Sequence, residues 1–291
     1  MAIMAPADDV PFGVSLSVGD DGRPLRALLD EARALRVASV AVDIRLVERE
    51  LGAPEPAVPL DPPTIDGLAF GLLELEEEVL QDAYTLARET FDARRRHWRT
   101  GASLAALTSL RTTRGVAIDA ITAPDLVAWS DAELDYAARV AAACGARRLA
   151  TTASPAAPRR IAPGAQRHGL RLGLAIDAST SARDHHDLLQ ADPLVDLILA
   201  VDAQAPDGPD WWSAALEAHD GRLAYVLLRN AHAAGDVVTD ATRRLLHAMR
   251  ARADALPLSL EIAASTDAWP DDAERVLAAC RSVLEDRATR P

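Results

Sequence analysis

The sequence contains no lysine: all 31 residues of the lysine and arginine class are arginines, and seven histidines accompany them. This absence excludes two kinds of site, because a Schiff-base mechanism needs a lysine amine and a Walker-type phosphate loop needs its lysine. The 44 acidic residues bring the net charge to -13. A surface of this sign excludes unspecific binding of nucleic acid, which requires a positively charged face.

Cysteines and long apolar runs are also scarce. The two cysteines, Cys144 and Cys280, lie in separate helix-like segments without a C-x-x-C motif, which predicts reduced core thiols. No segment approaches the roughly 18 uninterrupted apolar residues of a membrane span, and the start of the chain lacks the apolar core of a signal peptide. We therefore expect a cytoplasmic protein without a membrane partner. Its composition, rich in alanine and arginine, is typical of bacteria with GC-rich genomes.

Eight short apolar runs recur along the chain. They cover residues 12–18, 37–44, 115–121, 147–153, 170–177, 195–202, 223–230 and 256–263. Helical patterns lie between several of them or follow the last, at residues 24–36, 130–146, 210–220, 239–255 and 270–286. Strands that alternate with helices favour parallel pairing through crossovers. Eight such strands predict a single α/β domain over residues 1–291, a closed (β/α)8 TIM barrel.

One connection is far longer than a single crossover requires. Residues 46–113 separate the second and third runs and contain a proline-rich loop, a long charged helix pattern and a second helix pattern. We interpret this segment as an enlarged helical crossover after the second strand, or alternatively as a small helical subdomain. Long charged helices outside a barrel often bind a second subunit or cover the barrel mouth, so the segment predicts a homodimer, with a lid as the alternative.

Five of the apolar runs carry a carboxylate at their end or within two residues of it. The five acids are Asp43, Asp119, Asp177, Asp202 and Glu261. Side chains alternate between the two faces of a strand, and the face of Asp177 also carries Gly173 and Ala175, whereas the opposite face carries large aliphatic residues. Large aliphatic residues suit the outer helices. The acids are therefore predicted to face the barrel axis at the carboxyl ends of the strands, where barrel enzymes have their active sites.

Two interpretations of these acids remain open. An aspartate that follows a strand is also a common helix cap or loop starter, so each acid could act locally. If the acids instead converge on one cavity, their repulsion must be relieved by a divalent cation, by raised pKa values with shared protons, or by arginine partners.

The order of the runs and several motifs resemble the xylose isomerase-like barrel superfamily, which includes sugar phosphate isomerases and epimerases. The motifs are AARVAAACGARRLATTAS (137–154), GAQRHGLRLGLAID (164–177), GRLAYVLLRN (221–230) and LPLSLEI (256–262). The resemblance extends from about Phe12 to Leu284 and concerns the pattern of the sequence. It implies a barrel that acts as an isomerase, epimerase or lyase on a small polyhydroxylated or carbonyl compound.

The resemblance also implies a divalent metal held by Glu, Asp, His and Glu from strands five to eight. The first three of these positions hold residues that do not ligate metals: Ala175, Ala200 and Leu227. Only Glu261 matches, while Asp177 and Asp202 lie two residues further along their strands and keep the inward parity. We therefore expect either Mn²⁺ or Mg²⁺ bound by these three carboxylates with waters, or a site without a metal.

These observations predict an enzyme that moves a proton beside a substrate carbonyl. The catalytic carboxylates would be Glu261, Asp177 and Asp202. The residues assigned to contacts with a small-molecule substrate are Arg229, Asn230, Asp43, Asp119 and Trp211. A guanidinium fork suits an oxygen or a phosphate group. A non-catalytic relative that keeps the barrel for binding or assembly is the alternative, and the acidic net charge disfavours an apurinic-site nuclease.

Overall fold

The computed structural model describes most of the predicted strands and helices. The described residues are 14–18, 23–50, 52, 85, 89, 92–93, 101–123, 126–180, 186–188, 190, 192–202, 210–218, 221–231, 238–251, 257–262 and 269–285. No helix among these residues is long and apolar enough to cross a membrane.

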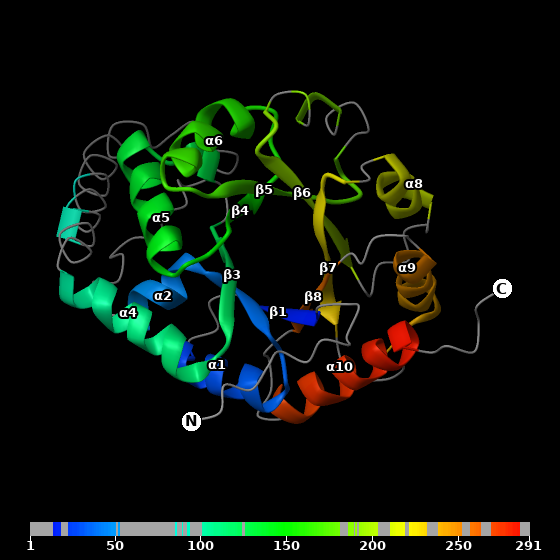
Figure 1. The fold of residues 1–291 in the computed structure, drawn as a ribbon. Coiled ribbons are helices and arrows are strands. Elements are labelled where there is room, and N and C mark those ends of the chain that lie inside the picture. Colours follow the sequence, from blue (N-terminus) through cyan, green and yellow to red (C-terminus); the bar gives the residue numbers. More distant parts are fainter. Residues whose placement is uncertain are drawn as a thin grey trace, which may run out of the picture.

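Eight parallel strands close into one barrel in the order of the sequence (Figure 1). They are β1 (Val14–Val18), β2 (Ser39–Asp43), β3 (Ala117–Thr122), β4 (Arg148–Thr152), β5 (Arg171–Ile176), β6 (Val195–Asp202), β7 (Leu223–Ala231) and β8 (Leu258–Ile262). The ring closes where Val14 of β1 pairs with Leu258 of β8. The predicted (β/α)8 barrel is thereby confirmed.

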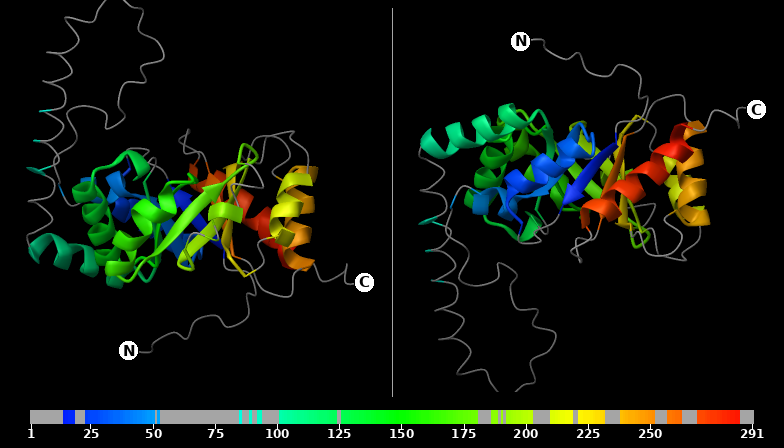
Figure 2. Two further views of the ribbon diagram at one scale, coloured as in Figure 1. Left: turned by 90° about the horizontal axis from the view of Figure 1, so that it is seen from above. Right: turned by 90° about the horizontal axis from the view of Figure 1, so that it is seen from below.

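Helices surround the barrel on its outer side, as Figure 1 and the two turned views of Figure 2 show. Those described are α1 (Leu25–Ala34), α2 (Ile44–Glu50), α4 (Gly101–Arg114), α5 (Asp131–Ala143), α6 (Ala157–Arg167), α8 (Asp210–Ala218), α9 (Asp240–Ala251) and α10 (Trp269–Glu285), with a short 3-10 helix η2 (Leu126–Ala128). The predicted segment 46–113 begins within α2 and ends within α4. Its residues 53–84 lie outside the described residues, so the enlarged crossover stays a prediction.

Local sequence signals explain where α5 begins and ends. The Ser130 hydroxyl accepts a hydrogen bond from the backbone N–H of Glu133, and the Glu133 carboxylate accepts one from the N–H of Ser130, which forms a capping box. At the other end, Gly145 has a φ of 69°, and the N–H of Ala146 donates to the carbonyl of Ala141 at 3.0 Å. Glycine adopts this left-handed conformation without a steric penalty, so the chain can turn directly into β4.

Two apolar layers hold the fold together. The larger one lies between the strands and the helices and contains the outward side chains of the strands, such as Leu172, Leu174 and Ile176 of β5. The smaller one fills the barrel interior and consists mainly of small residues: Ala41, Ala120, Ala150, Ile198, Ala200, Tyr225 and Leu227, with Ala175 and Ala224 packed against them. We call this second set the inner cluster. It separates the two ends of the barrel, so that polar groups at the amino ends and at the carboxyl ends form separate sites.

Candidate functional site

A cavity of about 540 Å³ opens at the carboxyl ends of β5, β6 and β7. Its lining includes Asp177, Ser179, Asp202, Trp211, Trp212, Arg229 and Thr242. The volume lies within the range of about 300–1,000 Å³ that is usual for small-molecule sites. The structure thus brings together four of the predicted site residues, namely Asp177, Asp202, Arg229 and Trp211.

Asp177 follows β5 and is fixed by the turn after it. One oxygen of its carboxylate, Oδ1, accepts the backbone N–H of Ser179 at 2.9 Å and the hydroxyl of Ser179 at 2.6 Å. Burial acts to raise the pKa of Asp177, but these hydrogen bonds and the positive charge of Arg229 outweigh it. The pKa therefore lies below the usual value of an aspartate. Asp177 is an ionised group with a fixed orientation at the edge of the cavity.

Asp202 and Arg229 lie side by side on neighbouring strands. They are paired in the register of β6 and β7, and both line the cavity. Asp202, the last residue of β6, is exposed, whereas Arg229 is half-buried. The arginine therefore lies beside Asp202, and its charge also attracts Asp177. An arginine partner is one of the three ways in which the repulsion between carboxylates can be relieved.

Two tryptophans and a threonine complete the outer side of the cavity. Trp211 and Trp212 come from the start of α8, where Trp212 is only 6% exposed and packs in the main core while Trp211 is half-buried. Thr242 lies in the first turn of α9. Ser179 and Thr242 were not among the residues predicted from the sequence. Two sequence patterns could have indicated them. Ser179 carries a hydroxyl two residues after the aspartate that follows β5. Thr242 belongs to a Thr-x-x-Thr pattern at the start of a helix, in which the Thr239 hydroxyl accepts the N–H of Thr242.

Asp43 has a local role at the other side of the barrel mouth. It ends β2 directly before α2, and its Oδ1 accepts the backbone N–H of Arg45 at 2.8 Å. This is the hydrogen bond of a helix cap, one of the two interpretations that the sequence left open. Asp43 is not among the residues that line the cavity.

The prediction that Asp119 lies at the carboxyl end of its strand is wrong. β3 continues beyond it to Thr122, and the register with β2 shifts between Val40 and Ala41, so Asp119 is an extra, bulged residue. The next residue, Ala120, pairs with Arg148, the first residue of β4. Asp119 therefore lies at the amino end of the barrel, with the inner cluster between it and the cavity.

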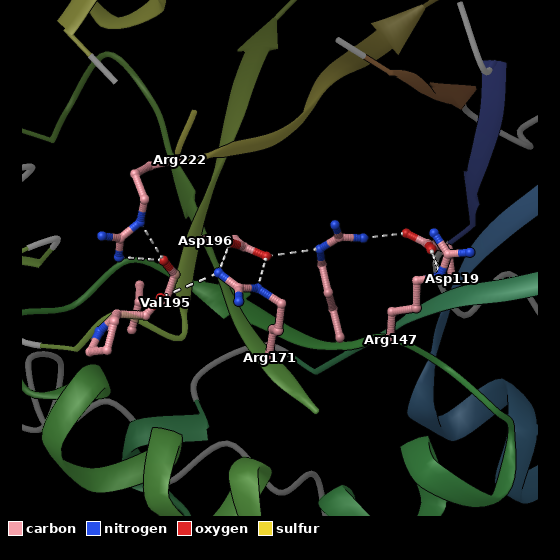
Figure 3. Close-up of polar contacts among 8 residues, drawn as sticks. Asp119, Arg147, Arg171, Val195, Asp196 and Arg222 are labelled. Atoms are coloured by element: carbon pink, nitrogen blue, oxygen red, sulfur yellow. Dashed lines mark hydrogen bonds and ion pairs between the residues drawn. The ribbon is translucent and has the colours of Figure 1, made fainter. Parts of the chain in front are cut away.

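At that end Asp119 belongs to a network of arginines and aspartates (Figure 3). Arg148 donates to Asp119 at 2.6 Å and to Asp196 at 3.2 Å, and Arg171 donates to both oxygens of Asp196 at 2.7 and 2.5 Å. Arg147 contacts Asp119 at 3.7 Å from an exposed position. The network links the starts of β3, β4, β5 and β6 and neutralises the charges that the barrel encloses there.

Two further predicted residues, Glu261 and Asn230, lie in described strands, but their own side chains are not described. Glu261 is in β8, where its backbone pairs with Ser17 of β1, and Asn230 is in β7. Their proposed contacts with a metal or a substrate stay predictions.

The described residues do not fit the metal site that the resemblance implies. Ala175, Ala200 and Leu227 occupy three of its four positions, and all three belong to or pack against the inner cluster. In the described part of the chain, no group of three or more histidine, cysteine, aspartate or glutamate side chains could hold a metal ion. Asp177 and Asp202 lie in the cavity, but Arg229 already brings positive charge to both of them.

No model of a known protein family and no curated protein matches this chain. Solved structures do match it. A sugar phosphate isomerase/epimerase from Parabacteroides distasonis ATCC 8503 is 11% identical with a TM-score of 0.57, and the match covers 96% of this chain and 98% of that one. A xylose isomerase domain protein from Alicyclobacillus acidocaldarius is 16% identical with a TM-score of 0.55, and the match covers 93% and 98% of the two chains.

An AP endonuclease of family 2 from Brucella melitensis is also similar, at 13% identity and a TM-score of 0.54 over 92% of this chain and 96% of that one. At such low identities the likeness concerns the fold and not the activity. The closed barrel, its strand order and these matches agree: the chain has the fold of the xylose isomerase-like TIM barrels.

Proposed function

We propose that the cavity binds a small polyhydroxylated or carbonyl compound and that the protein moves a proton beside the carbonyl group, as an isomerase, epimerase or lyase does. The observation that carries this proposal is the meeting of Asp177, Asp202 and Arg229 in one cavity of about 540 Å³ at the carboxyl ends of the strands. Carboxylates accept hydrogen bonds from hydroxyl groups and exchange protons, and a guanidinium polarises a carbonyl oxygen.

The two aspartates have different roles in this proposal. One oxygen of Asp177 is held by the N–H and the hydroxyl of Ser179, so its carboxylate positions the substrate through the other oxygen. Asp202 is exposed to the cavity at the end of β6 and is the proton-transfer residue. Arg229, beside Asp202, holds the carbonyl oxygen on which negative charge develops as the proton leaves.

The test is the exchange of carbon-bound hydrogen with solvent deuterium, followed by proton NMR for a panel of ketoses, aldoses and hydroxyketo acids. We expect exchange at the carbon beside the carbonyl of at least one compound. Asp202→Asn should slow it by about 10²-fold or more, the usual contribution of a positioned acid or base. The matched control is Asp271→Asn, an exposed position on α10, which should leave the rate unchanged. Equal rates for Asp202→Asn and the parent protein would refute the role of Asp202.

A non-catalytic binding protein is the second candidate, favoured by the apolar residues at three of the four positions of the implied metal site. It is distinguished by the same experiment. Binding of a compound to the cavity without any deuterium exchange across the panel would establish this second function in place of the first.

A further inference from the structure

The charges in the cavity differ from those of a metal-dependent site. Among the described lining residues, two carboxylates, Asp177 and Asp202, meet a single guanidinium, that of Arg229. The arginine stands two residues beyond Leu227 on β7, opposite Asp202 on β6. Positive charge is therefore provided within the chain at the point where the aspartates of β5 and β6 converge.

We infer that Arg229 supplies the positive charge that a divalent metal would supply, and that the cavity takes an uncharged polyhydroxylated carbonyl compound instead of a sugar phosphate. A guanidinium has five N–H donors in a planar fork, so it can bind a carboxylate and still donate to a substrate oxygen. The inference rests on the proposed function for the type of reaction. It adds that the ligand is uncharged and that its binding does not require a metal ion.

The charge balance argues against a phosphate group. A phosphate dianion would add to the two carboxylates, and one arginine cannot offset all of these charges in a half-enclosed cavity. The first turn of α9, whose amino end would otherwise favour an anion, begins with Asp240.

The remaining lining suits an uncharged sugar-like molecule. The hydroxyl of Ser179 can exchange hydrogen bonds with ligand hydroxyls while it also holds Asp177, and Thr242, whose hydroxyl bonds that of Thr239, lines the same cavity. The half-buried ring of Trp211 offers an apolar surface next to polar groups, as aromatic side chains at binding sites commonly do. A ligand with an apolar C–H face and several hydroxyls satisfies both kinds of surface.

The experiment compares matched sugars with and without phosphate. The probes are fructose against fructose 6-phosphate and ribulose against ribulose 5-phosphate, measured by calorimetry and saturation-transfer NMR on protein dialysed against EDTA, with and without added MnCl₂. We expect at least one free sugar to bind, its phosphate ester to bind at least about tenfold more weakly, and Mn²⁺ to change neither affinity.

Variants then test the role of the arginine. Arg229→Gln should weaken sugar binding by about ten- to a hundredfold, the effect of losing a charge-assisted hydrogen bond. Arg229→Lys keeps the charge without the planar fork and should bind with an intermediate affinity. Arg33→Gln, at an exposed position on α1, is the control and should bind as the parent does. If circular dichroism shows that Arg229→Gln does not fold, the Arg229→Lys variant decides.

Three results would overturn the inference: tighter binding of the phosphate esters, binding only in the presence of Mn²⁺, or no binding of any probe. Its failure is distinguishable from that of the proposed function. Binding of a free sugar without metal and without deuterium exchange supports the inference and refutes the proposed proton transfer. Deuterium exchange that requires Mn²⁺ supports the proposed proton transfer and refutes the inference.

Discussion

At the scale of the residue, one glycine inside the barrel is fixed by its neighbours. A Cβ atom added to Gly173 of β5 would lie 2.8 Å from Cδ1 of Ile198 and 3.4 Å from Cβ of Ala150. Both neighbours are buried in the inner cluster. The absence of a side chain at this position therefore makes room for the isoleucine.

We predict that Gly173→Ala lowers the free energy of unfolding by about 1 kcal/mol, because the added methyl group forces the end of the Ile198 side chain out of its packed position. Adding Ile198→Val, which removes Cδ1, should restore part of this loss. The control is Gly164→Ala on α6, where the nearest atom, of Arg167, is 3.8 Å away. Urea unfolding measures all variants, and an unchanged midpoint for Gly173→Ala would contradict the packing argument.

The turn after β5 predicts a dependence of stability on pH. Ser179 holds the pKa of Asp177 below its usual value in spite of burial. A carboxylate whose pKa is lower in the folded state than in the unfolded state stabilises the fold at every pH above the pKa of the unfolded state. This contribution is lost as the pH falls through the pKa of the folded state. Ser179→Ala should therefore destabilise the protein at neutral pH, and the difference from the parent should shrink below about pH 4. Unfolding curves across this pH range test it, and a difference independent of pH would contradict it.

Single residues also show which parts of the site could be predicted from the sequence and which could not. Strand alternation placed Asp177 and Asp202 on the inner face, and both line the cavity. The same alternation failed for Asp119, because parity does not show where a strand ends or where a bulge inserts a residue. The arginines at the start of the next strands, Arg148 and Arg171, were a usable signal, since buried acids in a barrel need partners.

At the scale of the element, the ionic network ties four strand starts together. The side chain of Asp196 of β6 is only 10% exposed and forms ion pairs with Arg148 of β4 and Arg171 of β5. Beside it, Arg222 donates to the carbonyl of Val195 at 2.7 Å (Figure 3). It also donates to the carbonyl of Asp192 at 2.9 Å and so holds the chain that enters β6. The amino end of the barrel therefore depends on polar contacts, while the strands above it depend on apolar packing.

We predict that Asp196→Asn costs about 2 kcal/mol of unfolding free energy, because it removes the mostly buried carboxylate that binds Arg171 and Arg148 and leaves Arg148 with Asp119 as its remaining acidic partner. The matched control is Asp30→Asn. Its side chain is 57% exposed beside Arg114, and its loss should cost no more than about 1 kcal/mol. Chemical unfolding at low and high salt measures both. Equal effects of the two variants would show that the network is no stronger than a surface ion pair.

At the scale of the whole molecule, the barrel could be predicted because each of its eight strands is visible in the sequence as a short apolar run, and several of these runs are followed by a helical pattern. The predicted run at 37–44 became Ser39–Asp43, and the run at 195–202 became Val195–Asp202. The charge pattern of the cavity could be predicted only in part. Which carboxylates share a space depends on register and strand length, and these are set by contacts between segments far apart in the sequence.

The long segment between the second and third strands leads to a prediction about assembly. Its helix patterns carry the acidic run ELEEE at 74–78 and the basic run ARRRHW at 93–98, and charged helices of this kind outside a barrel often join subunits. We expect light scattering coupled to gel filtration to give the mass of two chains at moderate ionic strength. The mass of one chain over the whole concentration range would exclude the dimer.

The inner cluster has a consequence for how the protein could change its substrate. Two residues along a strand correspond to roughly 6.6 Å, so groups at Asp177, Asp202 and Arg229 stand one layer further out than Ala175, Ala200 and Leu227. A ligand at this height is recognised mainly by the strand ends and the beginnings of α8 and α9, and the inner cluster contributes Ala200 to the lining of the cavity. Selectivity thus resides mainly in the turns and helix starts above the packed interior. Exchanging the connections after β6 and β7 should redirect the protein to new compounds, whereas the turn after β5 must keep Asp177 and Ser179, because their hydrogen bonds also contribute to stability.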